Sequence, residues 1–61
     1  MNDDRFASEV YQAYVAATFA VRAKGLSGVK GRDIALNAAA DALSRRKGET
    51  VTKDTVVKYL E

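Results

Sequence analysis

Cysteine and histidine are both absent from this 61-residue sequence. Without cysteine, the chain can form no disulfide and can offer no thiolate to a metal. Without histidine, it lacks the commonest metal ligand and the commonest general base near neutral pH, so no imidazole can activate its serines. A chain this short also has little room for a pocket that raises the pKa of a carboxyl group by burial. We therefore expect no enzymatic activity, no catalytic residue, no metal and no cofactor.

Long apolar runs and a basic N-terminus are missing as well. The most apolar stretch, residues 13–23, is too short and too interrupted to cross a membrane. The chain opens with Met-Asn-Asp-Asp, whereas a secretory signal opens with basic residues and then becomes apolar. Together with the lack of cysteine, these features predict a cytoplasmic protein that makes no membrane contact.

Proline is absent, and glycine is confined to residues 25–31 and to Gly48. Because alanine is the commonest residue, the composition favours helix, and the glycines divide the chain into three segments. We predict an all-α fold, a single small domain with helices over about residues 4–24, 32–47 and 53–60. One of these helices is long and the other two are shorter.

The ends of the first helix carry residues that satisfy terminal backbone groups. Asn2 or Asp3 can cap its N-terminus, where the charges of Asp3 and Asp4 suit the helix dipole. Gly25 can take the left-handed conformation that closes a helix, with Leu26 folding back as the apolar contact. Both ends are therefore marked in the sequence.

The later connections carry similar signals. Gly48 follows three cations that suit the negative end of a helix dipole. Thr52 can cap the third helix, and Val51 can pack on Val56 across its first turn. No Gly-Lys-Ser/Thr sequence ends the segment 25–31 and no strand precedes it, so we expect no nucleotide site there. We expect this segment to present Lys30 and Arg32 while Leu26 and Val29 pack against the core.

The first helix has two apolar faces. One face repeats at spacings of three and four and comprises Phe6, Val10, Ala13, Tyr14, Ala17 and Val21. The other comprises Tyr11, Val15 and Phe19, with Arg22 close by. Either the two short helices wrap the first on both sides, or the second face meets another chain. Because so small a core usually needs a further support such as a second subunit, we expect a homodimer.

The second helix has one apolar face, made of Leu36, Ala39, Ala40 and Leu43. The third helix is too short to persist alone in water, so it must dock on the other two. Its expected buried stripe is Val56, Tyr59 and Leu60.

The net charge of +2 hides an uneven distribution. Residues 1–21 carry three acids and one base, whereas residues 22–58 carry nine bases and four acids. A basic surface with an acidic N-terminal tip is typical of nucleic-acid-binding proteins. A solvated surface that is merely rich in Lys and Arg has the same composition.

The segment Thr52–Leu60 resembles the recognition helix of helix-turn-helix DNA-binding domains. A capping threonine is followed by polar positions, and then by Thr-Val and Tyr-Leu pairs. The resemblance implies that the side chains facing the major groove are Thr52, Lys53, Thr55 and Lys58. It implies that Val56, Tyr59 and Leu60 hold the helix to its neighbour. The same ending also resembles the end of a histone fold.

Two functional hypotheses follow. The first is a small DNA-binding regulatory protein that acts in transcription. Its DNA-binding residues would be Lys30, Arg32, Arg45, Arg46, Lys47, Lys53, Thr55 and Lys58, with the cations of 45–47 on the phosphate backbone. The second is a helical module that binds another protein as an adaptor, inhibitor or antitoxin-like partner. The dimer or partner interface would be formed by Tyr11, Val15, Phe19 and Arg22.

Overall fold

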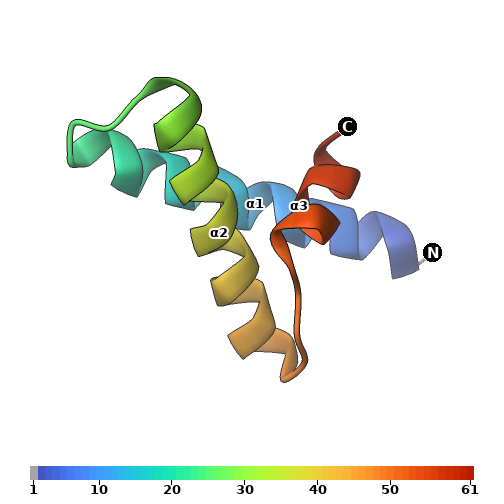
Figure 1. Cartoon of the computed structure of the whole chain (residues 1–61). Coiled ribbons are helices and arrows are strands. Elements are labelled where there is room, and N and C mark those ends of the chain that lie inside the picture. The colour runs from blue at the N-terminus through green and yellow to red at the C-terminus, as the bar shows by residue number, and fades with distance from the viewer. Residues whose placement is uncertain (1) are drawn as a thin grey trace.

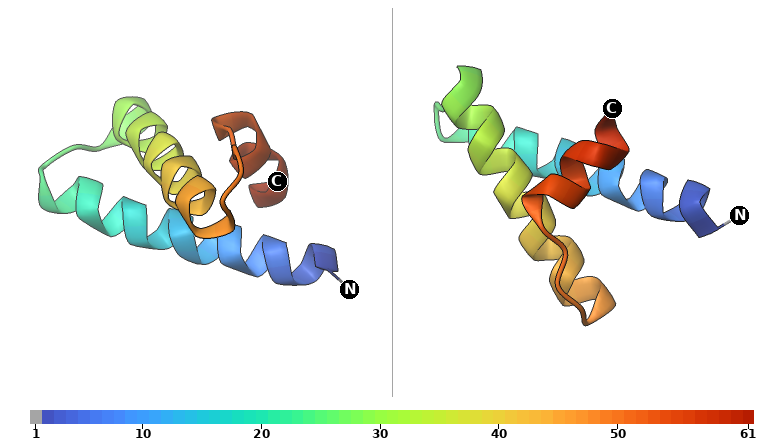
Figure 2. Two further views of the ribbon diagram at one scale, coloured as in Figure 1. Left: turned by 90° about the horizontal axis from the view of Figure 1, so that it is seen from below. Right: turned by 45° about the vertical axis from the view of Figure 1, so that its right-hand side comes forward.

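Three helices form the fold, and the computed structural model describes the backbone of residues 2–61 and the side chains of residues 5–61. The helices are α1 (Asn2–Ala23), α2 (Gly28–Lys47) and α3 (Lys53–Leu60). α2 crosses α1 steeply, and α3 lies beside α2 on the same side of α1 (Figures 1 and 2). The predicted all-α, three-helix fold is confirmed. The expected N-terminal cap of α1 falls outside the described side chains.

The start of α2 differs from the sequence prediction, which placed it near Arg32. The helix begins at Gly28, after Ser27 in an extended conformation (φ −154°, ψ 178°). Gly31 therefore lies inside the helix, and its amide donates to the Ser27 carbonyl at 3.2 Å. A Cβ at Gly31 would stand 3.2 Å from the carbonyl carbon of Leu26. The glycine thus permits a close approach between α2 and the preceding turn, rather than ending a helix.

The predicted closure of α1 at Gly25 is confirmed. Gly25 has φ +82° and its amide donates to the Arg22 carbonyl at 2.9 Å. The amide of Leu26 donates to the Val21 carbonyl at 3.2 Å, which completes a Schellman motif. Leu26 is half-buried, as expected. Val29 is 88% exposed, so its predicted packing is wrong: it stands on the first turn of α2, where neither neighbouring helix covers it.

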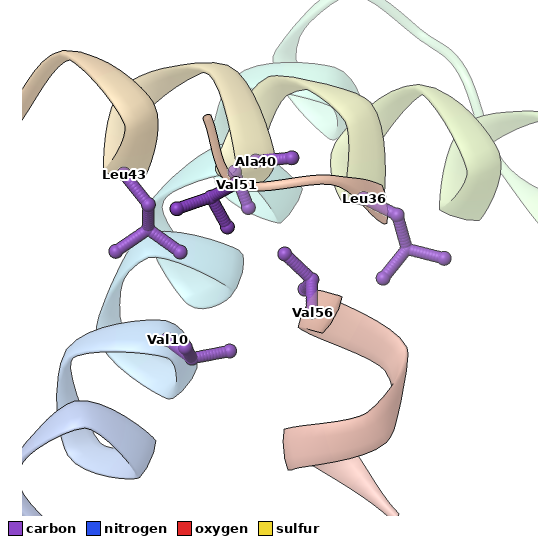
Figure 3. Packing of buried hydrophobic residues seen from close by; sticks show 7 residues of the cluster. Val10, Leu36, Ala40, Leu43, Val51 and Val56 are labelled. Atoms are coloured by element: carbon purple, nitrogen blue, oxygen red, sulfur yellow. The ribbon is translucent and has the colours of Figure 1, made fainter. Parts of the chain in front are cut away.

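The core lies where all three helices meet. Val10 of α1, Leu43 of α2 and Val56 of α3 are each less than 2% exposed (Figure 3). The surrounding buried side chains are Leu36, Ala39, Ala40 and Val51. Both predicted core faces are therefore confirmed, and the apolar face of α1 turns toward this cluster. Burying one such aliphatic side chain contributes about 1.5–3 kcal/mol.

Ser44 connects α2 to the segment that leads into α3. Its hydroxyl oxygen accepts a hydrogen bond from the Val51 amide at 2.8 Å. The hydroxyl lies 2.8 Å from the Ala40 carbonyl and 3.0 Å from the Val51 carbonyl, and can donate to either. The same residue's carbonyl accepts from the amide of Gly48, which has φ +71°. One serine therefore sets the path of the chain after α2.

The start of α3 is capped as the sequence predicts. The Thr52 hydroxyl accepts a hydrogen bond from the Thr55 amide at 3.3 Å. At its other end, the ring of Tyr59 meets the ring of Phe6 edge-on, with centroids 4.8 Å apart. Among residues 2–61, no helix combines the length and apolar character that crossing a membrane requires.

Replacing Ser44 with alanine tests the role of this hydroxyl. Because the amide of Val51, a buried residue, would lose its partner, we expect S44A to lower the free energy of unfolding by about 1–2 kcal/mol. The matched control is S27A, since the Ser27 side chain makes no cap hydrogen bond. Urea denaturation followed by circular dichroism measures both variants. Equal losses in the two variants would contradict the role assigned to Ser44.

Candidate nucleic-acid interface

The predicted DNA-binding residues fall into two groups on the folded chain. Arg45, Arg46 and Lys47 occupy the last turn of α2. Arg32 and Lys53 line a shallow groove of about 240 Å³ between the first half of α2 and α3. The two groups stand at opposite ends of α2, so Lys30 and Arg46 are about 24 Å apart along its axis at 1.5 Å per residue. The prediction of a single surface thus becomes two basic regions joined by one helix.

Lys47 is engaged with α1. Its ammonium lies 3.2 Å from Glu9 Oε2 and 4.7 Å from the centre of the Phe6 ring. Glu9 Oε2 is buried and makes no hydrogen bond of good geometry, so its compensation is the nearby positive charge. Both side chains are about two-thirds buried, with exposures of 32% and 29%. Lys47 therefore holds the end of α2 to α1, and its charge is partly neutralised.

Arg45 and Arg46 differ from Lys47 because their guanidinium groups remain accessible. Arg45 pairs with Asp41 one turn earlier, at 3.1 Å, but the two side chains are 81% and 64% exposed. Such an exposed pair contributes about 0.3–0.5 kcal/mol and leaves the guanidinium accessible. Arg46 is exposed and lies at the edge of a groove between α1 and α2. Both remain able to reach a polyanion.

On α3, Lys53 forms an ion pair with Asp33 of α2. The sequence placed Lys53 outward, whereas here it is half-buried and fastens the start of α3 to α2. Thr55 is also half-buried, with its hydroxyl 3.2 Å from that of Thr52. Lys58 is exposed. Only part of the polar face that the resemblance implied is thus open to solvent.

The scaffold positions of α3 lie on its other side. Val56 is fully buried, and Tyr59 and Leu60 are half-buried against the core. These placements agree with the roles that the sequence assigned to the three residues. They fix which face of α3 points outward.

Four cations of α2 and α3 form no ion pair with any of the side chains described here, residues 5–61. They are Lys30, Arg32, Arg46 and Lys58, and all four are exposed. None of them is paired directly with a carboxylate of these side chains, so they contribute to the positive potential of this surface. Glu9 and Asp33, the acids that pair with Lys47 and Lys53, were not predicted from the sequence. Both are distant in sequence from their lysines, and no local pattern marks such pairs.

The aromatic residues of the predicted dimer or partner interface on α1 are exposed, and Figure 2 shows that α2 and α3 both lie on one side of α1. Tyr11 and Phe19 are 61% and 66% exposed, Val15 is half-buried and Arg22 is exposed. Neither α2 nor α3 covers this face, which removes the alternative in which the short helices wrap α1 on both sides.

Comparison with protein-family models, curated proteins and solved structures finds no match to this chain. The surfaces described above are therefore the basis for a functional proposal.

Lys47 and Arg45 provide a direct comparison of a structural and an accessible cation. Replacing Lys47 with glutamine leaves the buried oxygen of Glu9 uncompensated and removes the contact with Phe6. We expect K47Q to lower the free energy of unfolding by about 1–2 kcal/mol. R45Q, the matched control, should change it by less than about 0.5 kcal/mol. Urea denaturation distinguishes them, and equal effects would contradict the assignment.

Proposed function

We propose that this chain is a small DNA-binding protein that contacts phosphates through the exposed cations of α2 and α3. The contacting residues would be Lys30, Arg32, Arg46 and Lys58, together with Arg45. The observation that carries the proposal is that these side chains are exposed, and that four of them form no ion pair among the described side chains. Lys47 and Lys53 act mainly as structural contacts between helices.

The physical basis is the release of counterions. Each lysine or arginine that neutralises a phosphate displaces condensed cations from DNA, so affinity falls steeply with salt. Exposed cations on flexible stems serve this purpose, whereas lysines already paired with carboxylates would first have to break those pairs. Phosphate contacts position a protein without reading sequence. A regulatory role would need additional base contacts, for which the resemblance of α3 suggests Lys58 and Thr55.

A charge-matched comparison tests the proposal. R46Q and K58Q should each weaken binding to a mixed-sequence duplex and reduce the slope of log K against log salt by about one. K24Q removes an equal charge at a residue that is not among the proposed contacts, and should have a smaller effect. Fluorescence anisotropy of a labelled duplex across a salt series measures all three.

Two results would overturn the proposal. One is the absence of binding by the unaltered chain at low salt. The other is an equal loss in all three variants, since that would show a response to net charge alone. Circular dichroism of each variant confirms that the helices are retained.

The exposed apolar face of α1 favours a second candidate function, a protein-interaction module. Large aromatic side chains that are mostly exposed are typical of interaction surfaces. A charged substitution at Phe19 would then abolish binding of a foreign partner and leave any self-association intact. If the same face pairs two copies of this chain, F19D would instead produce a monomer.

A further inference from the structure

A small cavity lies at the junction of α1 and α2, at the end of the molecule away from both termini (Figure 1). Its volume is about 170 Å³, and its lining comes from the second half of α1, the turn that follows and the first half of α2. The buried part of this lining is apolar and comprises Val21, Gly31 and Ala35. Among the described residues, no acid lines the cavity, whereas two arginines do. The cavity is therefore a small recess with positive charge on its exposed side.

Arg22 and Arg32 come from different helices, and both line this cavity. Both side chains are exposed, and neither forms an ion pair with another side chain of residues 5–61. Arg32 also lines the groove beside α3, but the acid there, Asp33, pairs with Lys53. Two positive charges at one cavity repel each other, and an anion between them replaces this repulsion with attraction. The arrangement therefore favours a bound anion.

The segment around the cavity is basic and includes a hydroxyl group that is free to donate. Residues 22–32 carry four cations and no acid, and these charges contribute to a positive potential at this end of the molecule. The side chain of Ser27 is exposed and makes no cap hydrogen bond to α2, so its hydroxyl can donate to a ligand. The Thr18 hydroxyl already donates to the Tyr14 carbonyl at 2.9 Å. Ser27 is thus the hydroxyl that adds a donor to the two guanidinium groups.

We propose that this cavity binds a phosphate group, held by Arg22 and Arg32 with the Ser27 hydroxyl as a further donor. A planar guanidinium group can form two parallel hydrogen bonds to phosphate oxygens, which a lysine ammonium cannot. Pockets for drug-sized ligands measure about 300–1,000 Å³, so this cavity is too small for a nucleoside and suits a single phosphate. The phosphate can belong to a nucleic-acid backbone or to a free phosphate ester. Either source needs the same donors, so the site does not depend on DNA binding.

Inorganic phosphate is the probe for the site, and the full chain is titrated with it at constant ionic strength. Proton–nitrogen correlation NMR spectra should show saturable shifts of amides within residues 22–32, whereas sodium chloride should produce none that saturate there. R22Q and R32Q should each weaken phosphate binding by roughly tenfold, because each loses a hydrogen bond between charged groups. K24Q is the matched control, since Lys24 belongs to the same segment but does not line the cavity. It should change the affinity by less than about twofold, because salt screens exposed charges.

Lysine substitutions separate a built site from a diffuse positive potential. R22K and R32K keep the charge and lose the planar fork, so each should still weaken phosphate binding by several-fold. A response to charge alone would leave both variants equal to the unaltered chain. Because Arg22 and Arg32 are exposed, we expect all of these variants to keep their helices, which circular dichroism checks.

A labelled duplex identifies the source of the phosphate. If a DNA backbone supplies it, R22Q should reduce the slope of log K against log salt by about one, and K24Q should reduce it less. An unchanged slope in R22Q, with saturable binding of inorganic phosphate, would assign the site to a free phosphate ester. A chain that binds inorganic phosphate but no duplex would overturn DNA binding and leave this site in place.

Three results would overturn the site itself. Shifts that are the same with phosphate and with chloride would show that the chain does not bind phosphate selectively. Equal losses of phosphate affinity in K24Q and R22Q would show a response to net charge. Phosphate binding by R22K and R32K that equals that of the unaltered chain would exclude recognition by the guanidinium fork.

Discussion

The packing of Val10, Leu43 and Val56, each from a different helix, is the contact on which the rest of this fold depends (Figure 3). α3 has eight residues, too few to persist as a helix in water. It exists because Val56 is buried, because Ser44 fixes the incoming chain and because Thr52 caps the first turn. The position of every cation on α3 therefore depends on that small core, in a chain that no disulfide supports.

Local signals in the sequence were sufficient to predict much of this fold. Gly25, Gly48 and Thr52 marked helix ends because their roles involve only neighbouring residues, and the spacing of apolar residues identified the core face of α1. The start of α2 was misplaced because the role of Gly31 depends on how closely Leu26 approaches it. Of the candidate site, exposure of Arg46 and Lys58 could be predicted. The pairing of Lys53 with Asp33 could not, because it joins residues that only tertiary structure brings together.

The cations of α2 and α3 have two different roles in this fold. Lys47 and Lys53 fasten α2 to α1 and α3 to α2, and each is matched by one carboxylate. Lys30, Arg32, Arg46 and Lys58 have no such match among the described side chains and stand on the surface. α1 shows a similar division, since one face builds the core and the other remains open. A domain this small can thus carry exposed cations on α2 and α3 and exposed aromatic side chains on α1.

Sedimentation equilibrium of the unaltered chain, alone and with a mixed-sequence duplex at low salt, tests this account most directly. The homodimer expected from the sequence predicts a mass approaching twice 6.6 kDa for the chain alone. The account also predicts that the chain adds to the duplex at low salt and leaves it as salt is raised. A duplex whose mass does not change at low salt would contradict the proposed DNA contacts, and a chain that sediments as a monomer would contradict the expected homodimer.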